Sequence, residues 1–180
     1  MKYIISERQY KLLTEEDEVF KLPSIDYFGD WEIVQKFLER RGNPPYSIDG
    51  DLDLRKYDIE SLGNLQSVGG DLNLDGTNIK SLGNLQSVGG NLYLEGTKIE
   101  SLGNLQSVGG NLYLRYTKIE SLGNLQSVGG YLKLYGTNIK SLGNLVSVGG
   151  NLNLYGTPLS KTIKPEDIKK QVNVGKDIYL

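Results

Sequence analysis

A ten-residue block that returns every 20 residues constrains this chain more than any other feature. The block SLGNLQSVGG fills residues 61–70, 81–90, 101–110 and 121–130 without change, and it returns at 141–150 with Val146 in place of glutamine. A fixed period of this length is typical of a solenoid, in which each repeat forms one turn of a coil. One turn cannot bury both of its faces alone, so successive turns stack and share a continuous core. The sequence therefore predicts a repeat solenoid.

Within each repeat, the spacing of the apolar residues predicts a short strand followed by irregular backbone. In the copy that begins at Asp71, the apolar positions are Leu72, Leu74, Ile79, Leu82, Leu85 and Val88. The pattern Leu72-x-Leu74 has the period of two expected of a strand with one buried face. The later positions are three apart and are interrupted by glycines, which oppose a helix, so we expect extended or turn-like backbone there. The predicted parallel strands of a right-handed solenoid are centred on Leu52, Leu72, Leu92, Leu112, Leu132, Leu152 and Ile178.

The pattern Leu-x-Leu-x-x-Thr-x-Ile-x-x-Leu-x-x-Leu-x-x-Val, which covers residues 51–160, resembles the leucine-rich repeat. Its short period is similar to that of bacterial leucine-rich-repeat effectors, and the Val-Gly-Gly-x-Leu-x-Leu element resembles the L domains of growth-factor receptors. The predicted fold class is an α/β repeat solenoid, a leucine-rich-repeat-like coil with a parallel β-sheet on one face and helical caps at both ends. The resemblance implies a function in binding, through the strand-lined face.

The chain departs from that family at one column, where threonine replaces the usual asparagine or cysteine. If these threonines point inward, their hydroxyls must bond the backbone, since a buried polar group needs a partner. A column of asparagines is the other candidate ladder, and we interpret both columns as structural. The columns are Thr77, Thr97, Thr117, Thr137 and Thr157, and Asn64, Asn84, Asn104, Asn124 and Asn144.

Both ends of the chain differ from the repeats, as expected of a solenoid whose terminal core faces need covers. We expect an N-terminal helical cap over 1–49, the leucine-rich-repeat solenoid over 50–160 and a C-terminal capping repeat over 161–180.

Helix signals lie in both of these terminal segments. Ser6 is placed to cap a short helix, and Asp30 is placed to cap a stronger one over 31–41 with an apolar face. Near the other end, Pro165 begins a predicted short helix over 165–170, since proline is favoured in a first turn. Ile178 and Leu180 then supply a closing strand.

Composition excludes several classes of function. The chain has no histidine and no cysteine, which removes the commonest general base, the thiolate metal ligands and any disulfide. We therefore expect no catalytic residues, no metal and no cofactor. The formal charge of −2, from 20 basic and 22 acidic residues, argues against a nucleic-acid partner.

The N-terminal residues turn polar too soon for a signal sequence, and no apolar run reaches the length of a membrane span. We expect a cytoplasmic protein with no membrane partner.

The outward-facing strand positions vary from copy to copy, whereas the core columns hardly change. One varied region, the acidic patch, consists of Asp51, Asp53, Asp71, Asp75 and Glu95. Stacked like charges destabilise a sheet, although Arg55 against Asp75 and Glu95 against Arg115 offer partial relief. The patch is either an attraction for a basic partner, a weak calcium site or a solvated, solubilising face, and we favour the last.

A second varied region of the same face is aromatic. The tyrosine surface consists of Tyr93, Tyr113, Arg115, Tyr131, Lys133, Tyr135 and Tyr155. Tyrosine favours strands for structural reasons, but exposed tyrosines in adjacent columns exceed that need, and tyrosine and arginine dominate interface energetics. We expect this surface to bind a partner. Tyr116 replaces a glycine of the other copies, which indicates that its turn does not strictly require glycine.

The sequence thus predicts a non-enzymatic protein-binding module, an inhibitor or adaptor of phage or bacterial type. The alternative is a structural subunit that self-assembles as a homo-oligomer or decorates a particle. Near-identical repeats suggest recent duplication, which is common in phage and effector genes.

Overall fold

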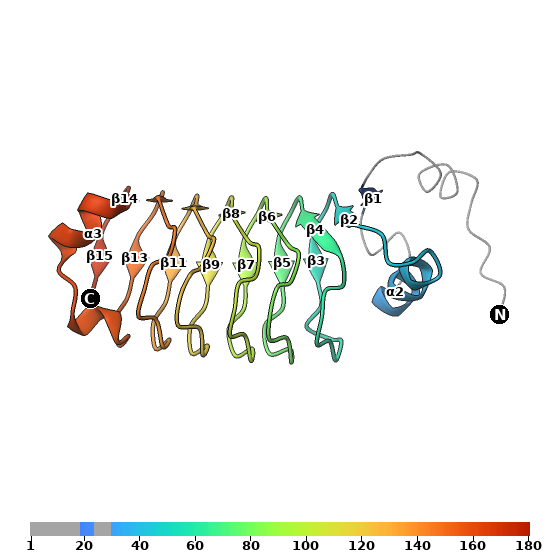
Figure 1. The fold of residues 1–180 in the computed structure, drawn as a ribbon, viewed down its shortest axis with the longest axis horizontal. Helices are drawn as coiled ribbons and strands as arrows, with labels where there is room; N and C mark the ends of the chain where they lie inside the picture. Colours follow the sequence, from blue (N-terminus) through green and yellow to red (C-terminus); the bar gives the residue numbers. More distant parts are fainter. Residues whose placement is uncertain (1–18, 24–29) are drawn as a thin grey trace.

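The computed structural model describes residues 19–23 and 30–180, in which the chain forms a parallel-strand β-solenoid with few helices. Figure 1 shows the turns stacked along the long axis, with α2 (Trp31–Glu39) at one end and α3 (Pro165–Gln171) at the other. A short 3₁₀ helix, η2 (Leu159–Lys161), precedes α3. The predicted short helix that begins at Ser6 lies outside the described residues.

One sheet contains the predicted strands, each of which begins at an apolar residue of the Leu-x-Leu pattern. We call it the Leu sheet, and its order is β15-β13-β11-β9-β7-β5-β3. All neighbours pair in parallel and in a constant register, as in Leu72 opposite Leu92 and Leu92 opposite Leu112. The prediction of parallel strands is therefore confirmed, including the last strand. The strands are β3 (Leu52–Asp53), β5 (Leu72–Asn73), β7 (Leu92–Tyr93), β9 (Leu112–Tyr113), β11 (Leu132–Lys133), β13 (Leu152–Asn153) and β15 (Ile178–Tyr179).

A second parallel sheet, which the sequence analysis expected only as extended or turn-like backbone, runs along another side of the coil. We call it the Ser-Val sheet, and its order is β1-β2-β4-β6-β8-β10-β12-β14. The N-terminal segment predicted as helical contributes its first two strands. The strands are β1 (Phe20–Leu22), β2 (Tyr46–Ile48), β4 (Leu65–Val68), β6 (Ser87–Val88), β8 (Ser107–Val108), β10 (Ser127–Val128), β12 (Ser147–Val148) and β14 (Asn173–Val174).

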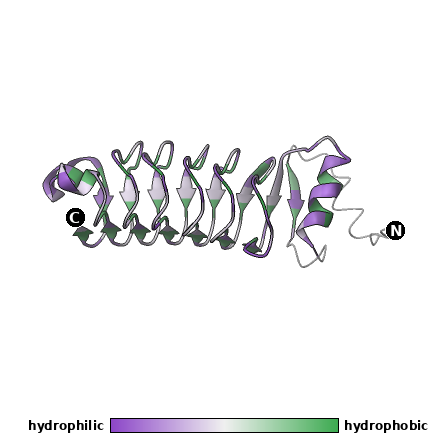
Figure 2. Cartoon of the chain, turned by 90° about the horizontal axis from the view of Figure 1, so that it is seen from below, coloured by the Kyte–Doolittle hydropathy of each residue, from purple (hydrophilic) through white to green (hydrophobic). Residues whose placement is uncertain are grey.

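The core is a column of aliphatic side chains repeated at every turn. In the copy that begins at Asn111, Leu112, Leu114, Ile119, Leu122 and Leu125 are fully buried and Val128 nearly so. Hydrophobic segments recur at the same place in each turn in Figure 2. Because every turn uses the same positions, the core is continuous from one end of the coil to the other.

The threonine column is buried and bonds the backbone of its own turn. Each threonine hydroxyl donates to the carbonyl oxygen of the leucine three residues earlier, as Thr117 does to Leu114 at 2.8 Å. The same bond is made at 77, 97, 137 and 157. The asparagine column differs, since all but the half-buried Asn64 are exposed, and its bonds, such as Asn84 to Asn64 at 2.9 Å, join neighbouring turns at the surface.

Helix α2 begins where its cap predicts and ends at Glu39, two residues before the end of the predicted helix over 31–41. The Asp30 side chain accepts a hydrogen bond from the Glu32 N–H at 3.0 Å, which satisfies a donor that the first turn leaves free. Trp31, Val34 and Leu38 are buried and belong to the same hydrophobic cluster as the solenoid core. At the other end, α3 carries Pro165 in its first turn and buries Ile168 in that cluster.

Candidate functional site

The outward face of the Leu sheet carries all the residues predicted to bind a partner. Along each strand, buried leucines alternate with side chains that reach solvent, as Leu72 and Leu74 alternate with Asp71, Asn73 and Asp75. The constant register aligns each outward position with its counterpart in the next turn, so three straight columns run along the coil. We call these the first, second and third columns, which begin at 51, 53 and 55. We call the whole outward face the strand face.

Two pairs of stacked tyrosines form the centre of the tyrosine surface. The rings of Tyr93 and Tyr113 lie 4.9 Å apart and are nearly parallel. The rings of Tyr135 and Tyr155 stack in the same way at 5.7 Å. The Lys133 ammonium lies 4.7 Å from the centre of the Tyr113 ring, within the range of a cation–π interaction. The structure thus brings these predicted residues together as one aromatic and cationic surface.

Tyr116 belongs to this surface, although it stands one residue beyond the third column. Its ring meets Tyr135 edge to face at 5.3 Å, and the Arg115 guanidinium lies 5.5 Å from it and 5.6 Å from Tyr135. A hydrogen bond with Tyr116 raises the pKa of the Tyr135 phenol. Arg115, Tyr116, Lys133, Tyr135 and Asn153 line an open depression of about 300 Å³. Tyr116 was not among the residues predicted to bind a partner. The sequence feature that could have identified it is its replacement of the glycine found at this position in the other copies.

The backbone at Tyr116 is left-handed, with φ of 60°, and the four equivalent glycines have φ of 68–75°. The interpretation that this turn does not strictly require glycine is therefore incomplete: tyrosine is accepted, but in a conformation that costs about 1–2 kcal/mol for an L-residue. The ring is also largely exposed, at 62 %. A large side chain held in an unfavourable conformation at the surface is a sign of selection for something other than stability.

The first column is a ladder between side chains and backbone. Each Asp or Asn side-chain oxygen accepts a hydrogen bond from the N–H at the same position in the next turn, as Asn91 does from Asn111 at 2.8 Å. The other acceptors are Asp51, Asp71, Asn111 and Asn151. Tyr131 has no oxygen near its Cβ to accept such a bond, so the ladder is interrupted between Tyr131 and Asn151.

The second column shows the same substitution. Asp53, Asn73 and Asn153 each accept a hydrogen bond from the N–H two residues later, at 3.0–3.1 Å. In the three turns between Asn73 and Asn153, the column instead holds tyrosine, tyrosine and lysine, which cannot make this short local bond. The tyrosine surface thus occupies positions at which other turns stabilise their own backbone.

Most carboxylates of the acidic patch have a structural role as hydrogen-bond acceptors. Asp51, Asp71 and Asp75 accept backbone N–H groups of the following turn, at 2.6–2.7 Å. Burial raises the pKa of the Asp75 carboxyl, and the Arg55 guanidinium lowers the pKa of Asp53.

The two predicted charge pairs have different outcomes. Arg55 forms its salt bridge with Asp53 of its own turn at 2.6 Å, and its positive charge only partly offsets the rise in the pKa of Asp75 that burial causes. The expected pair of Glu95 and Arg115 is present, at 3.8 Å. Among the residues that the structure describes, no group of three or more carboxylates could hold a metal ion, so the calcium alternative gains no support.

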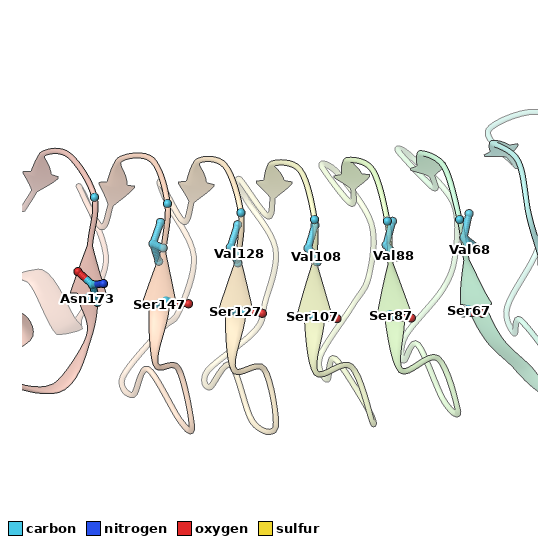
Figure 3. A pocket seen from close by; sticks show the side chains of 17 residues that line it. Ser67, Val68, Ser87, Val88, Ser107, Val108, Ser127, Val128, Ser147 and Asn173 are labelled. Atoms are coloured by element: carbon cyan, nitrogen blue, oxygen red, sulfur yellow. The ribbon is translucent and has the colours of Figure 1, made fainter.

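The Ser-Val sheet presents a contrasting outer face. Figure 3 shows its serines at matching places in successive turns, with Asn173 at the end of the column. The serines and glycines line an open trough of about 520 Å³. The glycines are required by packing, since a Cβ on Gly109 would overlap the Gly89 carbonyl oxygen of the turn before. Apart from Asn173 at its end, this face is the same in successive turns, so it has little that distinguishes one turn from another.

Comparisons of the chain with protein-family models, with curated proteins and with solved structures each find no match. No helix in the described part of the chain is both long and apolar enough to cross a membrane.

Proposed function

We propose that this protein is a non-enzymatic binding module that recognises a protein partner through the tyrosine surface, extended by Tyr116. One observation supports this most strongly: in the first two columns, Tyr93, Tyr113, Tyr131 and Lys133 replace Asp and Asn residues whose side chains bond the backbone elsewhere. Selection for stability alone would keep those acceptors. Residues that lower stability and cluster on one contiguous surface are expected where a protein is under selection to bind a partner.

The chemistry of this surface suits a protein partner. Tyrosine offers a large apolar area with few rotatable bonds to immobilise, and a phenol that can still form hydrogen bonds. The stacked pairs hold their rings in place before a partner arrives, which reduces the entropy lost on binding. Arg115 and Lys133 add attraction toward acidic groups.

The test is the double variant Tyr113→Ala with Tyr135→Ala, compared with Ser107→Ala and Ser127→Ala on the Ser-Val sheet. Both variants and the wild type would serve as bait in cell extract. The affinity of any protein that the wild type retains would then be measured by calorimetry. We expect the tyrosine variant to bind at least about tenfold more weakly, because truncating a central aromatic typically costs about 2 kcal/mol. The serine variant should bind like the wild type.

The melting temperature separates recognition from folding. Exposed cross-strand pairs contribute about 0.2–1 kcal/mol each, so the tyrosine variant should stay folded. Unchanged affinity in a folded tyrosine variant would contradict the proposal, and the acidic patch and the N-terminal segment would become the next candidates.

We further propose that the coil is organised like a leucine-rich repeat, with α2 and α3 as caps of its two ends. The Leu-x-Leu strands and the buried Thr column support the first point. The burial of Trp31, Val34 and Leu38 from α2, and of Ile168 from α3, supports the second. Caps of this kind keep the terminal core faces from water.

A further inference from the structure

Charge is segregated along the strand face. The three columns on β3, β5 and β7 carry the five carboxylates of the acidic patch and one cation, Arg55. The columns from β9 to β15 carry Arg115 and Lys133 against Asp177, and the Lys176 ammonium lies 5.6 Å from the Tyr131 ring. One half of the face is therefore acidic, and the other half is aromatic and cationic.

We infer that this face binds a second copy of the same chain, in an antiparallel two-fold dimer. The axis lies parallel to the strands, between β7 and β9. Rotation about it reverses the order of the turns but keeps each column opposite itself, so β7 faces β9, β5 faces β11 and β3 faces β13. The inference rests on the proposed function, because the same tyrosine surface serves both interactions.

The opposed residues are complementary at each of these levels. Glu95 lies opposite the partner copy's Arg115, in the same column, and Tyr93 lies opposite Tyr113 near the axis. One level outward, Asp71 and Asp75 meet Tyr131 and Tyr135, whose phenols can donate to carboxylates. At the outermost level, Arg55 meets the exposed ring of Tyr155. These pairs follow from the register of the Leu sheet.

The alternative face-to-face arrangement is disfavoured by the same charges. An axis along the length of the coil would place every turn opposite itself and the first column opposite the third, so Asp71 of each copy would face Asp75 of the other. Like charges brought together at an interface are strongly unfavourable. The segregation of charge therefore selects the reversed order of turns.

The size of the face predicts weak, reversible association. In this pairing the six strands β3 to β13 of each copy overlap, and at a spacing of about 4.8 Å they make a strip about 24 Å long and only three columns wide. Such a strip buries less than the roughly 1,200–2,000 Å² of total surface that a standard interface buries. Self-association would then compete with a protein partner for the tyrosine surface.

Charge reversal tests the pairing of Glu95 with Arg115. In sedimentation equilibrium, the wild type should be monomeric when dilute and dimeric at high concentration. Glu95→Arg and Arg115→Glu should each weaken association about tenfold or more. An equimolar mixture of the two variants should regain it, and so should the double variant in one chain. Glu95 and Arg115 also form a salt bridge within each copy, which both single variants remove. The melting temperature of each variant shows whether this loss destabilises the fold. A wild type that stays monomeric at all concentrations, or a mixture that associates no better than its components, would overturn the inference.

Crosslinking of introduced cysteines tests the reversed order of turns, since the chain has no cysteine of its own. Asn73→Cys and Lys133→Cys occupy the second column on β5 and β11, which face each other in the proposed dimer. A short bismaleimide can span the roughly 10 Å between packed sheets, and it should crosslink a mixture of these variants faster than either variant alone. Equal crosslinking of each single variant would refute the reversed order. If the wild type is monomeric but the Tyr113→Ala/Tyr135→Ala variant loses its partner, only the dimer is rejected and the proposed function stands.

Discussion

Replacing Gly109 with alanine should destabilise the fold by about 3 kcal/mol or more. The added Cβ would overlap the Gly89 carbonyl oxygen and lie 3.0 Å from its carbonyl carbon, and both atoms belong to the backbone of a paired turn. A flexible side chain could move aside, but a backbone within a continuous sheet cannot shift without displacing its own neighbours. Overpacking of this kind commonly costs 1–3 kcal/mol, and more where no relaxation is available.

The matched control is Gly96→Ala. An added Cβ there has no atom within 4 Å, so the only cost is the left-handed backbone, with φ of 69°. We expect a loss of about 1–2 kcal/mol for this control. Chemical denaturation of both variants measures the difference. Equal losses would show that the turns are not packed as closely at the Gly89–Gly109 contact as described.

Deleting residues 1–49 should convert the protein into an aggregating species. The deletion removes β2, whose strand pairs with β4, and the buried side chains of α2. The first remaining turn would expose its leucines and leave the strand β4 without a partner on one side. An unprotected strand edge beside an apolar surface is a template for association between chains.

Light scattering and thermal unfolding report this outcome. We expect large particles at micromolar concentration and a lower melting temperature for any soluble fraction. A monomeric deletion product that melts like the wild type would show instead that this segment is an appendage with no part in covering the core.

The sequence predicted the Leu sheet because Leu-x-Leu and the 20-residue period define both the strand and its partner. It also predicted α2 and α3 from their local signals, whereas it left open whether the threonine column is buried. The Ser-Val sheet could not be predicted in the same way, since its apolar positions, such as Leu105 and Val108, are three residues apart and show no alternation. Its strands form because stacking places identical extended segments side by side, which is a tertiary effect.

The candidate site was predicted in part. The outward columns and their aromatic content followed from the strand register. The sequence analysis considered the aspartates of the first column only as charges. It did not predict their hydrogen bonds to the backbone, because these bonds join positions 20 residues apart. For the same reason, the sequence alone could not show that Tyr131 interrupts a hydrogen-bond ladder. Tyr116 was not predicted as a site residue. Both became informative only once neighbouring turns could be compared in space.

The variant Tyr131→Asn tests most directly whether the tyrosine surface sacrifices stability for recognition. Asparagine at this position can accept the Asn151 N–H and complete the ladder, as Asn111 does for Tyr131 at 2.6 Å. We expect the free energy of unfolding to rise by about 1 kcal/mol, the typical net contribution of one hydrogen bond. Affinity for the protein partner should fall about tenfold.

The control Asn111→Ala removes the equivalent bond one turn earlier, so it should lower stability by a similar amount while it leaves the tyrosine side chains in place. Unfolding free energy and partner affinity are measured for both variants. We expect Tyr131→Asn to be more stable than the wild type and to bind the partner more weakly. Lower stability, or binding equal to that of the wild type, would contradict this expectation.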